Sequence, residues 1–150
     1  SRLMQLMPWS ELILRLPAGR IPDLLPLAGE AFEIAGTALR LRPPTVQALR
    51  PAPALRSRLV TIKPREGFTD EAFAAAARRQ LDALGVSPAA AAAVGRRRTL
   101  RIRGREIIGH ELILEGLTAA ESLAVQAAGL GGRRSMGCGL FVPLGVREGR

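Results

Sequence analysis

Residues 57–144 alternate between two hydrophobic periodicities, and this alternation restricts the possible folds more than any other feature of the chain. Residues 57–63 (SRLVTIK) direct their side chains to two sides in turn and include β-branched residues, which predicts a strand. Thr69 is a candidate N-cap for a helix that ends before Gly85, because alanine, phenylalanine and leucine recur there at helical spacing. We therefore expect a strand followed by a helix.

A β-hairpin is expected next. Residues 96–103 (RRRTLRIR) alternate with a period of two, Gly104-Arg105 supplies a tight turn, and residues 106–117 form the returning strand with a bulge at Gly109. Residues 87–95 (SPAAAAAVG), which precede the hairpin, have little side-chain specificity. We expect them to form a connector with one or two helical turns.

The last part of the chain predicts one more helix and one more strand. Thr118 and Glu121 have the spacing of a capping box, and the helix that begins there continues to Gly129. Residues 140–144 (LFVPL) predict a closing strand. The order strand, helix, strand, strand, helix, strand is that of a ferredoxin-like, RRM-like βαββαβ fold, so the predicted class is α+β. The expected core residues are Phe32, Phe68, Phe73, Leu81, Leu84, Leu123, Val125 and the LFV strand.

Four closely spaced prolines mark a domain boundary near Pro53, because such a run disfavours both a continuous helix and a central strand. We expect one domain over residues 1–53 and a second over residues 54–150. The first contains no clear first strand, so we interpret it as an incomplete ferredoxin-like domain of a longer protein. The elements expected there are the end of a helix in residues 1–7, a strand over Glu11–Leu16, a helix over Ile21–Ala31 and short strands within residues 32–49.

The charge of the chain indicates a polyanionic partner. The sequence has 21 Arg, one Lys and 13 acidic residues, which give a net charge of +9 and a pI near 11.6. Each cation placed on a phosphate releases a counterion, so nucleic acid is the expected partner and an anionic membrane surface comes second. A GC-rich coding bias can explain the ratio of arginine to lysine, but it does not explain the excess of cations over acids.

A membrane-spanning or metal-binding protein is not expected. No apolar run reaches the roughly 18–20 residues needed to cross a bilayer, and the first residues lack the pattern of a secretion signal, so we predict a cytoplasmic protein with no membrane partner. Cys138 and His110 are the only cysteine and histidine, which excludes an internal disulfide and a zinc site of four such ligands. We expect no cofactor and no metal.

Two short segments hold eight of the arginines. Residues 96–105 carry six, although any single one could instead be a solvated strand edge. Residues 129–143 (GLGGRRSMGCGLFVP) carry two more between glycines, whose exposed N–H groups would form a concave anion site while arginine grips a phosphate through two hydrogen bonds. A loose connection with solvated arginines is the alternative. The candidate nucleic-acid-binding residues are Arg96, Arg97, Arg98, Arg101, Arg103, Arg105, Gly131, Gly132, Arg133, Arg134 and Ser135.

The glycine-rich segment, preceded by a helix and followed by a short apolar strand, resembles the glycine-rich loop of the CRISPR-associated RAMP superfamily. It is most similar to the repeat-processing endoribonucleases of type I systems, and RLVTIK, GRRRTLRI and LTAAESLAVQ extend the similarity to their Myxan-subtype form across residues 55–143. The resemblance implies tandem ferredoxin-like domains that bind CRISPR repeat RNA in a basic groove. It also implies one metal-independent cut at the base of the repeat stem-loop, which yields guide RNA, and continued binding with other Cas proteins in a type I effector complex.

The catalytic residue remains unassigned. Attack by the substrate's own 2′-OH needs a general base, and enzymes of this family usually carry a catalytic histidine near the first helix of the first domain, where this sequence has SRLMQLMPW. His110, in the strand EIIGHELIL, is interpreted as structural, with a general base as the alternative. The base therefore lies in an absent segment, or positioning and arginine suffice, or the chain only binds RNA. The competing functions are a catalytically silent RAMP subunit that holds the guide RNA handle and a general RNA-binding protein.

Overall fold

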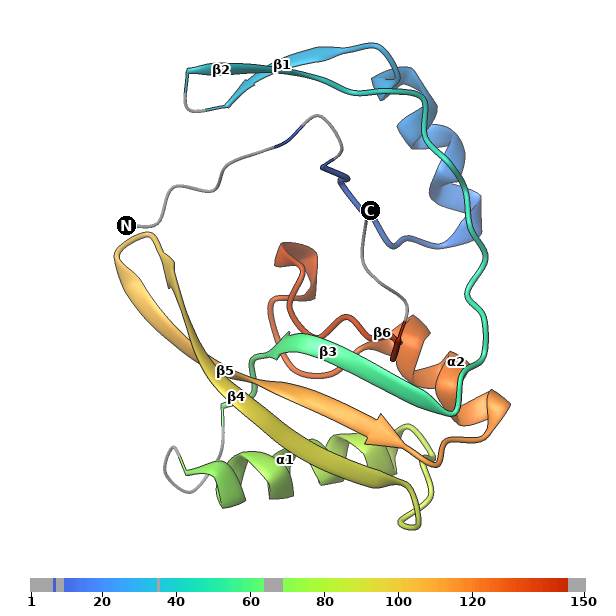
Figure 1. Ribbon diagram of the computed structural model, residues 1–150, viewed down its shortest axis with the longest axis vertical. Helices are drawn as coiled ribbons and strands as arrows, with labels where there is room; N and C mark the ends of the chain where they lie inside the picture. Colours follow the sequence, from blue (N-terminus) through green and yellow to red (C-terminus); the bar gives the residue numbers. More distant parts are fainter. Residues whose placement is uncertain (1–6, 8–9, 35, 64–68, 146–150) are drawn as a thin grey trace. The chain divides into compact units, whose positions relative to one another are not determined.

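The computed structural model describes residues 7, 10–34, 36–63 and 69–145, which divide into two compact units (Figure 1). The first unit lies within residues 1–48 and the second within residues 49–146. Among the described residues, α-helices occur in the second unit alone. The second unit also contains the larger sheet and both arginine-rich segments.

The first unit consists of a 3-10 helix and a two-stranded antiparallel sheet. The helix, η1 (Ala18–Leu27), contains Pro22 and Pro26. Proline lacks the N–H of an α-helical hydrogen bond, so the helix predicted over Ile21–Ala31 forms as 3-10 turns and ends early. The sheet pairs β1 (Ala31–Ile34) with β2 (Thr37–Arg40), which confirms short strands in this region.

The strand predicted over Glu11–Leu16 is wrong, because these residues have no regular secondary structure. A strand needs a neighbour that accepts its backbone hydrogen bonds, and β1 and β2 pair with each other, not with this segment. The expected helix end falls mostly on residues 1–6, outside the described part of the chain.

The second unit has the complete βαββαβ order that the sequence predicts. Its four-stranded antiparallel sheet has the order β4-β5-β3-β6, with β5 and β3 in the centre (Figure 1). This is the strand order of a ferredoxin-like fold, so the predicted α+β class is confirmed. The elements are β3 (Ala54–Val60), α1 (Asp70–Ala83), β4 (Ala91–Ile102), β5 (Arg105–Glu115), α2 (Ala119–Ala128), a short 3-10 helix η2 (Arg134–Met136) and β6 (Val142–Pro143).

The helices begin where their capping residues predict. The Thr69 hydroxyl accepts the Ala72 N–H at 3.1 Å at the start of α1. The capping box of Thr118 and Glu121 forms at the start of α2, with the Thr118 N–H donating to the Glu121 carboxylate at 2.8 Å. Gly129 ends α2 with a φ of 66°, in the left-handed region that glycine favours.

The core lies between the helices and one face of the sheet. It includes Phe73, Ala76, Ala77 and Leu81 of α1, Val125 of α2, Leu55 of β3, Leu112 and Leu114 of β5, and Phe141. The expected core positions Phe32 and Leu123 are wrong, since both are exposed. On α2 the buried positions beside Val125 are Ser122 and Gln126, which form hydrogen bonds with the backbone of residues 50–52 and leave Leu123 on the outer side.

The connector expected over residues 87–95 covers residues 87–90 only, and its predicted helical turns are wrong, because Ala91–Gly95 forms the first part of β4. Alanine favours helices, but here Ala92 and Val94 pair with Leu114 and Leu112 of β5, and tertiary pairing overrides the propensity.

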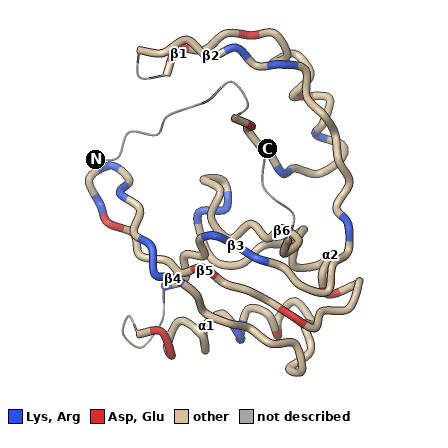
Figure 2. The backbone as a smooth tube through the Cα atoms, in the orientation of Figure 1, with Lys and Arg blue, Asp and Glu red and all other residues tan. Residues whose placement is uncertain are grey.

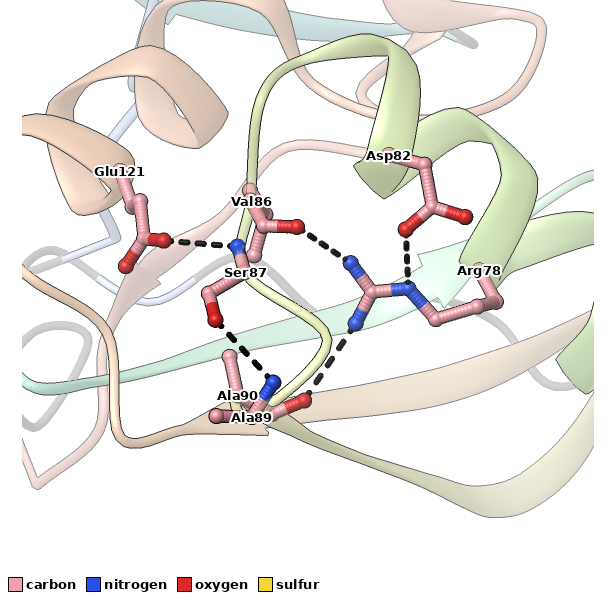
Figure 3. Close-up of polar contacts among 7 residues, drawn as sticks. All are labelled: Arg78, Asp82, Val86, Ser87, Ala89, Ala90 and Glu121. Atoms are coloured by element: carbon pink, nitrogen blue, oxygen red, sulfur yellow. Dashed lines mark hydrogen bonds and ion pairs between the residues drawn. The ribbon is translucent and has the colours of Figure 1, made fainter.

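Arg78 and Glu121 fix the turn that leads into β4 (Figure 3). The Arg78 guanidinium donates to the carbonyls of Val86 at 2.7 Å and Ala90 at 3.4 Å, while its Nε donates to Asp82 at 2.8 Å. The Ser87 N–H donates to Glu121 at 2.7 Å, which ties the same turn to the start of α2.

Glu111 of β5 faces a bulge on each neighbouring strand. The register of β4 shifts between Val94 and Arg97, and that of β3 shifts between Ser57 and Val60, so two residues on each side oppose Glu111. The bulge predicted at Gly109 is therefore misplaced, because Gly109 pairs regularly with Arg98.

Gly109 has a different structural role, which is to let β3 approach closely. A Cβ atom added at Gly109 would lie 2.5 Å from the Val60 carbonyl oxygen, a distance that real Cβ contacts do not reach. Gly132, by comparison, has no atom within 3.8 Å of an added Cβ and does not have a left-handed φ.

We expect Gly109→Ala to lower the free energy of unfolding by about 1–3 kcal/mol, because β3 and β5 must separate to admit the methyl group. Chemical denaturation measures this change. The matched control, Gly132→Ala, should change the free energy of unfolding by no more than about 0.5 kcal/mol. Equal effects of the two substitutions would show that the close approach is not limiting.

Candidate nucleic-acid interface

The register of the sheet divides the predicted hairpin arginines between its two faces. His110 of β5 is buried against α1, and Arg97 pairs with His110, so Arg97 lies on the helix side. Arg98 pairs with Gly109 and lies on the other side, with Glu111 two residues along from Gly109. This side, opposite α1 and α2, is named the open face. The six arginines therefore do not share one surface.

The tip of the hairpin exposes three arginines around a two-residue turn. Arg103 and Gly104 have φ values of 49° and 76°, the left-handed pair typical of a type I′ turn. The turn predicted at Gly104-Arg105 is thus one residue too late, since Arg105 begins β5. Arg101 lies 3.4 Å from Glu106 in an exposed ion pair that contributes little stability. Basic positions follow β4 into this turn (Figure 2).

The open face contains a buried carboxylate, Glu111, whose side chain is 10% exposed. Arg56 of β3 directs its Nε and Nη2 to the same oxygen of Glu111, and the Arg96 backbone N–H also donates to this carboxylate. Burial alone would raise the pKa of Glu111, but the hydrogen bond and charge of Arg56, the Arg96 N–H and the charge of Arg98 hold it below its ordinary value. Glu111 therefore stays ionised among arginines.

Arg56 and Glu111 were not among the candidate residues chosen from sequence. A signal was present, because Glu111 is the one acid in the interior of the predicted returning strand, whereas Glu106 and Glu115 lie near its ends. A carboxylate at such a position requires a partner of opposite charge on a neighbouring strand. Arg56 is that partner, yet its identity depends on the pairing of β3 with β5, which the sequence does not display.

The glycine-rich loop is bound to the rest of the unit by two side chains from outside it. The Gly131 N–H donates to Oε1 of Gln80 at 2.7 Å, and the Gly132 N–H donates to the Thr61 carbonyl at 2.9 Å. The Thr61 hydroxyl donates back to the Gly132 carbonyl at 2.9 Å. The expectation that these two amides are exposed for an anion is therefore wrong; they anchor the loop to α1 and β3.

Three candidate residues follow these anchored glycines. Arg133 is exposed and has a φ of 56°, and Ser135 is exposed in η2. Arg134 is also exposed, but its Nη1 donates to the Ala128 carbonyl at 2.6 Å at the end of α2. Arg133 is therefore better placed than Arg134 to contact a ligand, because Arg134 would have to give up its hydrogen bond to the Ala128 carbonyl.

The hairpin and the loop lie at the same level of the sheet, on opposite sides of β3 and β5. Arg98 pairs with Gly109, Gly109 approaches Val60, and the next residue, Thr61, forms a β-bridge with Gly132. Adjacent strands are about 4.8 Å apart, so the backbones of the two segments lie about 14 Å apart across the sheet. A nucleic-acid strand carries phosphates over such a distance and can contact arginines of both segments.

His110 is held as a structural residue. Its ring packs on Phe73 with 4.4 Å between centroids, and its Nε2 lies 3.0 Å from the Asp70 carboxylate. Its Nδ1 is buried and has no hydrogen-bond partner among the described residues. The residue is 5% exposed and thus out of reach of a bound substrate.

Metal binding and thiol chemistry have little support in the described residues. No three acidic, histidine or cysteine side chains among them form a group able to hold a metal ion. Cys138 is buried, and burial raises the pKa of its thiol despite the nearby charge of Arg133 and a bond with Thr61, so the reactive thiolate is scarce. In the same part of the chain, no helix is both long and apolar enough to cross a membrane.

Comparison with known proteins relates the chain to a described family and to a named relative. The family described as Cas6 Crispr matches residues 1–145. A CRISPR-associated endonuclease Cas6 of Myxococcus xanthus (strain DK1622) is 51% identical over 132 residues, which cover 88% of this chain and 56% of that protein. The chain thus spans about half the length of this relative.

The depressed pKa of Glu111 predicts a pH-dependent contribution to stability. An ionised Glu111 stabilises the fold above its unfolded pKa of about 4.3, and this contribution is lost as the pH falls through the lower folded value. We expect Glu111→Gln to lower the free energy of unfolding at pH 7 by about 1–3 kcal/mol, with a difference that shrinks below about pH 4.

Denaturant titrations from pH 7 to pH 3 measure this difference. Glu115→Gln is the matched control, because Glu115 is exposed at the end of the same strand. A gap between wild type and Glu111→Gln that stays constant over this range would contradict the ionic role of Glu111.

Proposed function

The chain belongs to the Cas6 family of CRISPR proteins, and from this membership we propose that it binds the repeat stem-loop of precursor CRISPR RNA and cleaves it to give guide RNA. The observation that carries the proposal is its 51% identity to a protein named as a CRISPR-associated endonuclease. The ferredoxin-like sheet with arginines on its hairpin and its glycine-rich loop supports the same conclusion. We further propose that the chain acts in the cytoplasm and stays with its product, beside other Cas proteins, in a type I effector complex.

The proposed reaction needs no metal. The 2′-OH of the nucleotide before the cut attacks the adjacent phosphorus, its proton passes to a base, and the bond to the 5′-oxygen breaks as that oxygen takes up a proton. The products are a 2′,3′-cyclic phosphate and a 5′-hydroxyl. Arginine would stabilise the charge that develops on the phosphate oxygens. The proposal assigns no base among the described residues, because His110 is buried and bonded to Asp70.

The burial of His110 also supports a second candidate, a catalytically silent subunit that only holds the guide RNA handle. Such a protein would need the arginine surface but no proton transfer. The two candidates therefore share the binding site and differ in the cleavage step alone.

The full chain, incubated in EDTA with a labelled repeat RNA, should produce one cut that leaves a 2′,3′-cyclic phosphate. Product mapping by gel and mass spectrometry provides the readout. A copy of the RNA with 2′-deoxy substitution at the cut site should bind without being cleaved, because it lacks the nucleophile. Binding of both RNAs without cleavage would favour the silent subunit, and a failure to bind either would refute both candidates.

Arg133→Ala should weaken repeat RNA binding and reduce the slope of log affinity against log salt by about 0.7, the value for one lost single-strand phosphate contact. This substitution leaves the backbone bonds of the loop in place. Arg79→Ala removes an exposed arginine from α1 and is the matched control, expected to leave the slope unchanged. Equal slopes for wild type and Arg133→Ala would exclude a phosphate contact at this position.

A further inference from the structure

A buried acid on a surface that is proposed to bind a polyanion would oppose that binding unless the acid has another role. Glu111 lies in the middle of the central strand β5, on the open face of the sheet that also carries Arg98. A free carboxylate there would repel a phosphate. The backbone around Glu111 nevertheless accommodates its side chain.

Three features of the backbone accommodate Glu111. Both neighbouring strands form a bulge opposite this residue, and each bulge interrupts the regular ladder. Gly95, in the β4 bulge, has no side chain, and a Cβ added there would lie 2.7 Å from a carboxylate oxygen of Glu111. The sheet is therefore distorted on two sides around one carboxylate.

The charged groups that face Glu111 come from both neighbouring strands. Arg56 of β3 binds it through Nε and Nη2, and the Arg96 N–H and the charge of Arg98 approach it from β4. Two guanidinium groups thus face one carboxylate, which leaves an excess of positive charge on the open face.

Arg56 retains donors for a ligand. Guanidinium has five N–H donors in a plane, and the edge bonded to Glu111 uses only part of them. The Arg56 side chain is 41% exposed, so it reaches solvent while one edge is fixed. The Nε of Arg98 is buried and has no hydrogen-bond partner among the described residues, which leaves a donor on the same face without an acceptor.

We propose that Glu111 is a positioning residue that holds Arg56 and Arg98 on the open face as a binding site for a phosphodiester group of the RNA. A guanidinium fixed along one edge loses less conformational entropy when its other edge binds a phosphate. The inference rests on the proposed RNA binding, and it adds Arg56 and Glu111 to the residues that carry it.

The loss of negative charge and the loss of the anchor for Arg56 and Arg98 predict opposite effects of Glu111→Gln on RNA affinity. The substitution removes a negative charge from a basic surface, so simple electrostatics predicts tighter binding of RNA. Loss of the anchor predicts weaker binding, because Arg56 and Arg98 are no longer held. The sign of the change therefore separates the two roles.

The test is fluorescence anisotropy of a labelled repeat stem-loop with the full chain, over a series of salt concentrations at pH 7. We expect Glu111→Gln to bind about tenfold more weakly than wild type. Glu115→Gln makes the same change of charge on the same strand and should bind as wild type or slightly more tightly. Circular dichroism at the assay temperature verifies that each variant is folded.

A double-mutant cycle with Arg56→Ala tests whether the two residues act together. If Glu111 acts through Arg56, Glu111→Gln should weaken binding less in the Arg56→Ala background than in wild type, and the effect that remains is the share that acts through Arg98. Should Glu111→Gln fail to fold, Arg56→Lys provides the second route. It keeps the charge but loses the planar fork, and we expect about tenfold weaker binding.

Unchanged or tighter binding by folded Glu111→Gln, additive effects in the cycle, or unchanged binding by Arg56→Lys would each overturn the inference. These results differ from failure of the proposed function, in which the wild-type chain itself would not bind the repeat RNA.

Discussion

The fold of the second unit depends on β5, a central strand whose two faces have different neighbours. Toward the helices it presents Leu112 and Leu114, which are almost fully buried in the core. Toward the open face it presents Gly109, which lets β3 approach, and Glu111, around which both neighbouring strands bulge. Because a shift of one residue would exchange the two faces, the charge on Glu111 helps to fix the register of the whole sheet.

The order of elements in this unit could be predicted because each carries a local signal. Thr69 and Thr118 cap their helices through bonds to residues three positions away, which are visible in the sequence. The errors occur where distant contacts decide. Ala91–Gly95 has the composition of a helix, but its pairing with β5 makes it a strand. Leu123 was expected in the core, but Gln126 takes the inward position on α2 and donates to the Arg50 carbonyl.

The sequence identifies the arginines of the candidate binding surface, but it does not show how they are arranged on the sheet. Period-two alternation separates Arg97 from Arg98 in any strand, yet which of them faces the helices follows only from the pairing with His110 and Gly109. The glycines of the loop correctly indicated that its backbone lies close to neighbouring segments. Their amides, however, are used by Gln80 and Thr61, and no local pattern identifies partners 51 and 71 residues away.

The preference for arginine over lysine is explained in part by geometry. Arg78 binds one carboxylate and two backbone carbonyls, and Arg134 holds the last turn of α2. Arg56 binds Glu111 along one edge while remaining partly exposed. A planar guanidinium can serve several acceptors in fixed directions, whereas an ammonium group is a compact point charge on a flexible stem. Coding bias would place arginine without regard to such contacts, so at Arg78 and Arg56, where one guanidinium makes several bonds, geometry gives a reason for arginine that coding bias does not. Arginines that make these contacts are partly committed to the fold, so fewer of them are free to bind a ligand than the count of arginines suggests.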